Sequence, residues 1–159
     1  MSREQKNLPP VTDIEIDPSL RATTEKWFEY AIKVHPHHTD YAGIVWHGNY
    51  IQWMEEARIE YLNTIGIDYI DLVKAGCELP VVELNLRYHQ SLQMGESAFV
   101  RVKMCKTKGV RIHWDYEIVS LSCHKLCVSG RVTLVAIDSS KGKIMRSLPP
   151  VLQDALIKL

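Results

Sequence analysis

The sequence predicts an α+β domain in which one antiparallel sheet is covered by a single long helix. Several segments alternate apolar and polar residues with a period of two, as half-buried strands do. Short turn signals separate most of these segments, which is typical of antiparallel hairpins. One segment in the first half of the chain instead repeats its apolar residues with a helical period, and a one-faced sheet needs such a helix as its cover.

Length and composition limit the function classes. The chain has 159 residues, which suits one domain, and its 46% hydrophobic and 24% charged residues are ordinary for a globular protein. Nineteen basic residues balance nineteen acidic ones, so no overall field attracts nucleic acid or an anionic membrane. No apolar run is long enough for a membrane span, and the N-terminus lacks the apolar core of a signal peptide. We therefore expect a cytoplasmic protein.

The first elements are an arm, a strand and the long helix. Residues 1–22 contain three prolines and predict a flexible N-terminal arm. Residues 26–35 alternate as a strand, which Pro36 ends. Residues 50–66 carry one wide apolar stripe that predicts the long helix, with Asn49 as its N-cap. The stripe comprises Tyr50, Met54, Ala57, Tyr61 and Ile65, widened by Ile51, Trp53 and Leu62.

A short helical piece and four strands follow the long helix. The helical piece is predicted over 68–76, and the strands over 78–89, 97–106, 110–119 and 126–138. The alternation is cleanest in 110–119. Residues 149–159 predict a C-terminal amphipathic helix with proline in its first turn. The predicted organisation is thus an arm (1–22), one domain (23–148) and a C-terminal helix (149–159).

The stretch HPHHTDYAGIVWHGNY, residues 35–50, concentrates four histidines and one aspartate between the first strand and the long helix. Three imidazoles would suit a zinc ion. However, His37 and His38 are adjacent and would point in opposite directions in an extended chain, and Pro36 favours extension at His35. We therefore predict no metal site and assign His35 and His37 to a solvated loop beside a structural turn. The four cysteines form no CxxC pair, so we expect reduced structural thiols.

Asp40 and the helix start offer a different chemistry. A helix N-terminus presents unpaired N–H groups and the positive end of a dipole, which stabilise developing negative charge. A carboxylate that faces such donors across a small gap is the arrangement that acyl transfer to water requires.

Residues 39–62, TDYAGIVWHGNYIQWMEEARIEYL, resemble the catalytic loop and central helix of the hotdog-fold acyl-CoA thioesterases. The most similar branch is named for 4-hydroxybenzoyl-CoA thioesterase and includes the Tol–Pal-associated thioesterases. The spacing from the aspartate through AGIV and HGNY to EEAR matches without gaps. The resemblance covers about residues 26–138 and implies a hotdog fold, an antiparallel sheet wrapped around a long central helix.

The resemblance implies hydrolysis of acyl-CoA without a cofactor. It implies that Asp40 is the nucleophile or general base and that the backbone N–H of His47 polarises the thioester carbonyl. Gly48 and Asn49 would shape the corner between loop and helix. The family is oligomeric, so the resemblance also implies a homo-oligomer, a dimer or a homotetramer, with active sites at the subunit boundary.

Further residues are candidates for substrate contact. Trp46 and Tyr50 are near the expected acyl pocket, although aromatic side chains there serve equally well as core. Glu56 is the helix carboxylate whose position suits the active-site end, although a solvated charged face is the more common role. A basic hairpin formed by Lys106, Lys108 and Arg111 could meet the CoA phosphates or simply protect the sheet edge.

Two departures from the family pattern leave alternatives open. The third strand of the pattern commonly reads Tyr-x-x-Pro, and Ser91 stands where that proline would be. No second acidic residue is clearly placed for catalysis. The alternatives are a hotdog enoyl-thioester hydratase or dehydratase, which would need a histidine paired with a carboxylate, and a non-catalytic module that binds an acyl ligand.

Overall fold

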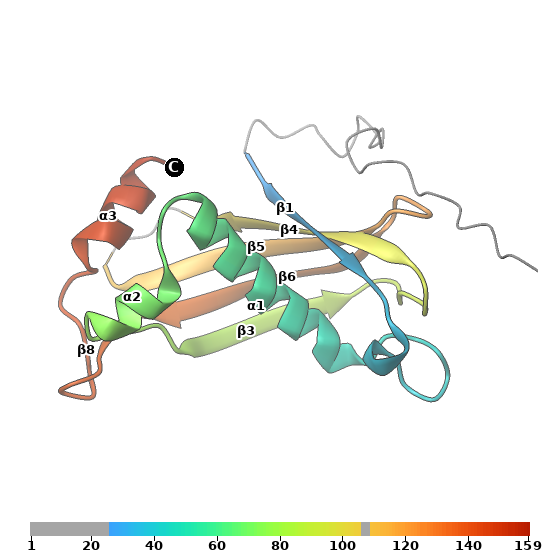
Figure 1. Ribbon diagram of the computed structural model, residues 1–159, viewed down its shortest axis with the longest axis horizontal. Coiled ribbons are helices and arrows are strands. Elements are labelled where there is room, and N and C mark those ends of the chain that lie inside the picture. Colours follow the sequence, from blue (N-terminus) through green and yellow to red (C-terminus); the bar gives the residue numbers. More distant parts are fainter. Residues whose placement is uncertain (1–25, 106–108) are drawn as a thin grey trace, which may run out of the picture.

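The computed structural model describes residues 26–105 and 109–159 (Figure 1). The predicted N-terminal arm, Lys106 and Lys108 lie outside the described residues. In chain order the elements are β1 (Phe28–Lys33), η3 (Pro36–His38), α1 (His47–Thr64), α2 (Tyr69–Lys74), β2 (Cys77–Glu78), β3 (Val81–Tyr88), β4 (Ser97–Met104), β5 (Arg111–Ser120), β6 (Leu126–Val135), β7 (Ile137–Asp138), β8 (Lys143–Ile144) and α3 (Pro150–Ile157).

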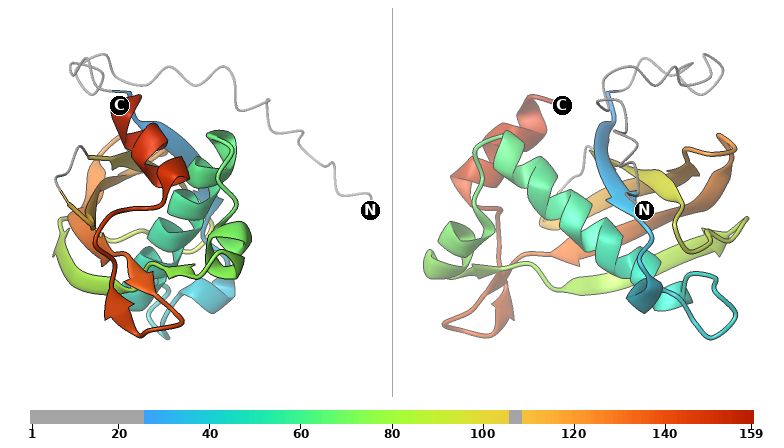
Figure 2. Two further views of the ribbon diagram at one scale, coloured as in Figure 1. Left: turned by 90° about the vertical axis from the view of Figure 1, so that its left-hand side faces the viewer. Right: turned by 45° about the vertical axis from the view of Figure 1, so that its right-hand side comes forward.

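The main layer is a five-stranded antiparallel sheet in the order β1-β4-β5-β6-β3. Helix α1 crosses one face of this sheet and packs chiefly on β4 and β1 (Figure 1). Elements α2, β8 and α3 gather at one end of the molecule, and the loop before α1 lies at the other (Figure 2). The predicted α+β class and hotdog arrangement are confirmed.

The core lies between α1 and the sheet. In β5 the inward residues are almost completely buried, and from Arg111 to Glu117 the residues between them are partly or fully exposed, as the period-two pattern predicts. At the end of the strand the outward Val119 is also buried. On α1 the buried stripe includes most of the predicted members, namely Tyr50, Trp53, Met54, Ala57 and Leu62. Two members are wrong, because Ile51 and Ile65 are 36% and 41% exposed.

The start of α1 also differs from the prediction. The helix begins at His47, with Trp46 at the N-cap position, so Asn49 lies inside the first turn and is not the cap. The Asn49 side chain is buried and is used for a tertiary hydrogen bond instead.

Two predicted strands are interrupted. The segment 126–138 ends its long pairing at Val135, and residues 137–138 join β2 and β8 in a separate three-stranded sheet. The segment 78–89 divides into β2 and β3 around Pro80, which has no N–H to donate to a ladder.

Strand β3 forms one edge of the main sheet and is mostly exposed along its length. Its apolar side chains Val81, Val82, Leu84 and Tyr88 are 42–51% exposed. From this strand Leu86 packs against the core, and Tyr88 reaches it through an edge-on contact with the Tyr50 ring. The sequence pattern correctly places a strand here, but in the single chain its predicted apolar face is largely uncovered.

Candidate active site

Asp40 lies on a tight hairpin formed by residues 39–45, which we call the Asp40 hairpin. Thr39 and Val45 pair at its base, and the Asp40 N–H donates to the carbonyl oxygen of Ile44 at 2.9 Å. Gly43 adopts a φ of +78°, which favours glycine at the turn. The partly buried Asp40 carboxylate accepts a 2.8 Å hydrogen bond from the N–H of Ala42, so its position is held by its own loop.

The connection between β3 and β4 supports the hairpin from one side. The Val45 N–H donates to the Leu92 carbonyl at 2.9 Å, and Ile44 pairs with Gln93. The Met94 N–H donates to the Gly43 carbonyl at 3.0 Å. Backbone hydrogen bonds therefore join the Asp40 hairpin to this connection.

The base of the hairpin is tied to α1 through one carbonyl group. The His38 oxygen accepts from the Trp46 N–H at 3.0 Å and from the Asn49 side-chain amide at 2.5 Å. Since Asn49 is buried and belongs to the first turn of α1, these two bonds set the hairpin relative to the helix start. The structure thus places Asn49 at the predicted corner, as a structural link.

The helix start presents the predicted donors. Within the described residues, the backbone N–H groups of His47 and Gly48 have no hydrogen-bond partner. Together with the dipole of the 18-residue helix they form a site of positive potential. A Cβ atom at position 48 would overlap the indole ring of Trp46, so glycine allows that ring to lie over the corner.

A hollow of about 240 Å³ opens beside the helix start. Its lining residues are Val45, His47, Tyr50, Tyr88, His89, Gln90 and Ser91. Tyr50 is almost fully buried, its oxygen accepts a hydrogen bond from the Leu92 N–H, and burial raises the pKa of its phenol. The core role of Tyr50 is therefore confirmed, and the side chain also forms a wall of the hollow, whereas its contact with substrate stays a prediction.

Sequence reasoning missed Tyr88, His89 and Gln90 as neighbours of the helix start. They belong to the Tyr-x-x-Pro-like segment, which drew notice only because Ser91 replaces the proline. Tyr88 stands at the tyrosine position of that pattern, and this match could have drawn attention to the segment. Pairing of β3 with β6 brings the segment to α1, a contact between residues about 40 positions apart.

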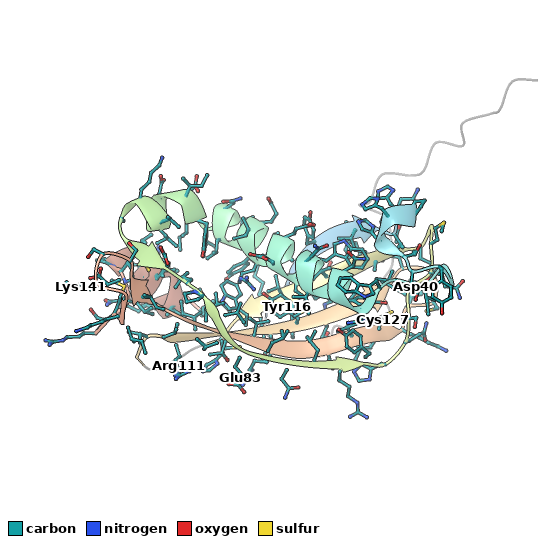
Figure 3. The ribbon with its side chains drawn as sticks, turned by 90° about the horizontal axis from the view of Figure 1, so that it is seen from below. Asp40, Glu83, Arg111, Tyr116, Cys127 and Lys141 are labelled. Atoms are coloured by element: carbon teal, nitrogen blue, oxygen red, sulfur yellow. The ribbon has the colours of Figure 1, made fainter. Side chains whose placement is uncertain are left out.

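Other candidates are less closely associated with the helix start. Asp40 lies at the same end of the molecule but does not line the hollow (Figure 3). Trp46 is half exposed. Glu56 accepts a 3.2 Å hydrogen bond from Tyr30 on β1 and lines a separate groove, so the structure does not bring it to the helix start. Arg111 is exposed at the start of β5, and both of its alternative roles, contact with CoA and protection of the sheet edge, stay hypotheses.

The histidines of the loop are arranged differently from the expectation. Residues 36–38 form one turn of 3₁₀ helix, so the rings of His37 and His38 lie 4.0 Å apart rather than on opposite sides. The His35 N–H donates to Nδ1 of His38, and burial, followed by the charges of His37 and His35, lowers the pKa of His38. Across residues 26–105 and 109–159, no group of three potential ligands is arranged to hold a metal ion.

A long helix laid across an antiparallel sheet is the hotdog arrangement, and in this chain an aspartate hairpin and free backbone donors lie at the helix start. The chain belongs to the thioesterase-like superfamily, whose family model matches residues 34–156. The resemblance seen in the sequence is therefore confirmed. No helix in the described part of the chain is long and apolar enough to cross a membrane.

Individual relatives agree with this assignment. The Synechocystis protein named "Putative esterase sll0410" is 56% identical over 140 residues, which cover 88% of this chain and 84% of that protein. "Putative acyl-CoA thioesterase YneP" of Bacillus subtilis is 31% identical over 112 residues, covering 70% and 80%. The solved structure of a DHNA-CoA thioesterase from Staphylococcus aureus has a TM-score of 0.77 and 30% identity, covering 83% of this chain and 89% of that one.

Proposed function

We propose that this protein hydrolyses acyl-CoA thioesters to a free carboxylic acid and CoA. The observation that carries the proposal is the pair of unpaired N–H groups at His47 and Gly48, placed directly after the hairpin that holds Asp40. Two relatives, YneP and the staphylococcal enzyme, carry names that specify CoA thioesters, which supports CoA as the leaving group.

The reaction would begin with the thioester carbonyl oxygen at the His47 N–H. This donor stabilises the oxyanion that develops when the carbonyl carbon is attacked. In one route the Asp40 carboxylate attacks, the C–S bond breaks, CoA leaves as the thiolate, and water then hydrolyses the acyl–aspartyl anhydride. In the other, Asp40 removes a proton from the water that attacks directly. Both routes consume one water and release acid and CoA.

The geometry gives less support to the hydratase alternative. That chemistry needs a histidine paired with a carboxylate, and no hydrogen bond joins the His47 ring to Asp40 in the described residues. The Asp40 oxygen instead accepts from its own loop, and the unpaired donors at the helix start are, among the described residues, backbone N–H groups. These features favour attack at the carbonyl over chemistry at the C2–C3 bond.

Hydrolysis can be tested with a panel of acyl-CoA and acyl-carrier-protein thioesters and a thiol-release assay. We expect release by the wild type and a fall in kcat of about 10²- to 10⁴-fold for Asp40→Asn. The matched control is Asp68→Asn, because the Asp68 carboxylate accepts the same kind of 2.8 Å bond from the N–H two residues ahead, at the start of α2. Hydration of an enoyl-CoA without thiol release would favour the hydratase. Binding without turnover would favour the non-catalytic module.

We also infer that a second copy of the chain covers the β3 edge. Among the described residues, this edge combines unpaired backbone groups with exposed apolar side chains, a combination that favours pairing with another strand. Sedimentation should show a dimer or larger oligomer that Leu84→Glu weakens and Val73→Glu does not, although both side chains are 42% exposed. A wild-type monomer at micromolar concentration would contradict the inference. The homotetramer and the cytoplasmic location stay predictions.

A further inference from the structure

Tyr88 makes a contact at the helix start that the proposed mechanism does not yet use. Its hydroxyl donates a 3.0 Å hydrogen bond to the carbonyl oxygen of His47. Tyr88 is the last residue of β3, whereas His47 is the first residue of α1, so the bond joins the sheet edge to the helix start.

The accepting oxygen belongs to the same peptide group as the Gly48 N–H. A hydrogen bond to a peptide oxygen draws electron density toward it and leaves the N–H of that peptide more positive, and such polarisation passes along chains of hydrogen bonds. The neighbouring peptide is polarised in the same way, because the Trp46 oxygen accepts from the Asn49 N–H at 2.9 Å. In both peptide groups, the one that carries the His47 N–H and the one that carries the Gly48 N–H, the oxygen therefore accepts a hydrogen bond.

The Tyr88 side chain is 47% exposed and is contacted by Tyr50. Its ring packs edge-on against the Tyr50 ring, with the centroids 5.7 Å apart, and the Tyr50 hydroxyl is bonded to the Leu92 N–H. Burial raises the pKa of Tyr88, so the phenol keeps the proton that it donates at neutral pH. Both tyrosines line the hollow together with His47, and Gly48 is the next residue of the helix start.

We propose that Tyr88 is a positioning residue for the hydrolysis reaction, and that its hydroxyl orients and polarises the His47–Gly48 peptide so that the Gly48 N–H acts as a second oxyanion donor. This inference rests on the proposed function. Tyr88 acts through the peptide and need not touch the reacting atoms. The advantage is specific to the transition state, because a donor that strengthens with the negative charge on oxygen stabilises the oxyanion more than the neutral thioester.

The test uses Tyr88→Phe, which keeps the ring and removes only the hydroxyl. Removing an oxyanion donor altogether slows an enzyme by about 10²- to 10³-fold, and a weakened donor should lose only part of that. We expect kcat to fall about 5- to 10-fold, with KM changed less than twofold. The control is Tyr69→Phe on α2, because the Tyr69 hydroxyl has no hydrogen-bond partner in the described residues.

A spectroscopic measurement separates polarisation from a general structural effect. In ¹H–¹⁵N spectra the Gly48 amide of Tyr88→Phe should move upfield in both dimensions, while amides in β5 keep their positions. Replacing Tyr88 with 3-fluorotyrosine, a more acidic phenol, should restore the amide position and raise kcat to at least the wild-type value, when measured at a pH where that phenol is protonated.

Three results would overturn the inference: an unchanged kcat in Tyr88→Phe, an unchanged Gly48 amide, or a loss of activity that follows a lowered melting temperature and is not restored by fluorotyrosine. Absence of thiol release by the wild type would instead refute the proposed function. The two failures are therefore distinguishable.

Discussion

The link between Asn49 and His38 allows activity to be separated from stability. In Asn49→Ala the side-chain amide that donates to the His38 oxygen is removed, while the backbone of the first helical turn keeps its sequence context. The His38 oxygen retains its bond from the Trp46 N–H, so no buried acceptor is left without a partner.

The expected change in stability is small. Loss of one neutral hydrogen bond costs about 1 kcal/mol. Alanine is favoured over asparagine inside a helix by roughly 0.6 kcal/mol, which offsets part of this loss. With some loss of packing at this buried position, we expect the free energy of unfolding to fall by about 1 kcal/mol and the melting temperature by about 2–4 °C.

The expected change in activity is larger. The removed bond joins the base of the Asp40 hairpin to the helix that carries the His47 N–H, so its loss lets the carboxylate and the donor move relative to each other. A misplacement of about 1 Å between catalytic groups can reduce the rate by about 10²-fold. We expect kcat of Asn49→Ala to fall by about 10- to 100-fold.

The assay is thiol release from the best acyl-CoA of the panel, together with thermal unfolding of the same samples. Asn63→Ala is the control, because Asn63 is exposed in the last turn of α1 and its side chain makes no hydrogen bond in the described residues. It should keep full activity. A fall in kcat of less than threefold for Asn49→Ala would refute the reasoning, since the hairpin would then be held without this bond.

Three other outcomes are expected. Gly130→Ala should lower the free energy of unfolding in urea by about 1–3 kcal/mol, because the new Cβ would lie 2.5 Å from the backbone of β3; unchanged stability would contradict this close approach. Tyr116→Phe should lower the free energy of unfolding, measured in the same way, by about 1.5–3 kcal/mol, since the buried Arg58 guanidinium loses its bond to the Tyr116 hydroxyl. Burial opposes ionisation of Glu96, but hydrogen bonds led by that from Ser122 outweigh it and lower its pKa. Its stabilisation is therefore present above the ordinary pKa of 4.5 and lost as the pH falls through the folded value, so the stability difference between wild type and Glu96→Gln should shrink in acid.

The parts of the fold that could be predicted from sequence are those with one dominant local period. Strand β5 is the clearest case, because its inward positions belong to the core and its outward positions from Arg111 to Glu117 are at least partly open to solvent. Helix α1 was predicted for the same reason, but its N-cap residue was not. The N-cap preference for asparagine pointed to Asn49, whereas a tertiary bond to His38 uses that side chain.

The candidate site likewise has a part that the local sequence predicts and a part that depends on contacts between distant segments. Asp40 and His47 lie seven residues apart in one short motif, so the sequence carried their relation directly. The bond from Tyr88 to His47 and the lining of the hollow depend on the pairing of β3 with β6, which no local pattern encodes. The compact 3₁₀ turn of the histidines was missed because the preference of the residue before proline for extension was carried through the whole segment.

The backbone bonds between the Asp40 hairpin and the connection between β3 and β4 also determine where the chain can accept insertions. Residues 92–94 hold Gly43, Ile44 and Val45 by backbone bonds, so an insertion there would shift the register of those bonds and carry the aspartate with it. The exposed turn at 139–142, at the opposite end of the molecule, is held largely by bonds to Asp138 at its own base. Inserted residues should therefore be accepted at that turn, whereas the connection after β3 must keep its length for the enzyme to remain active.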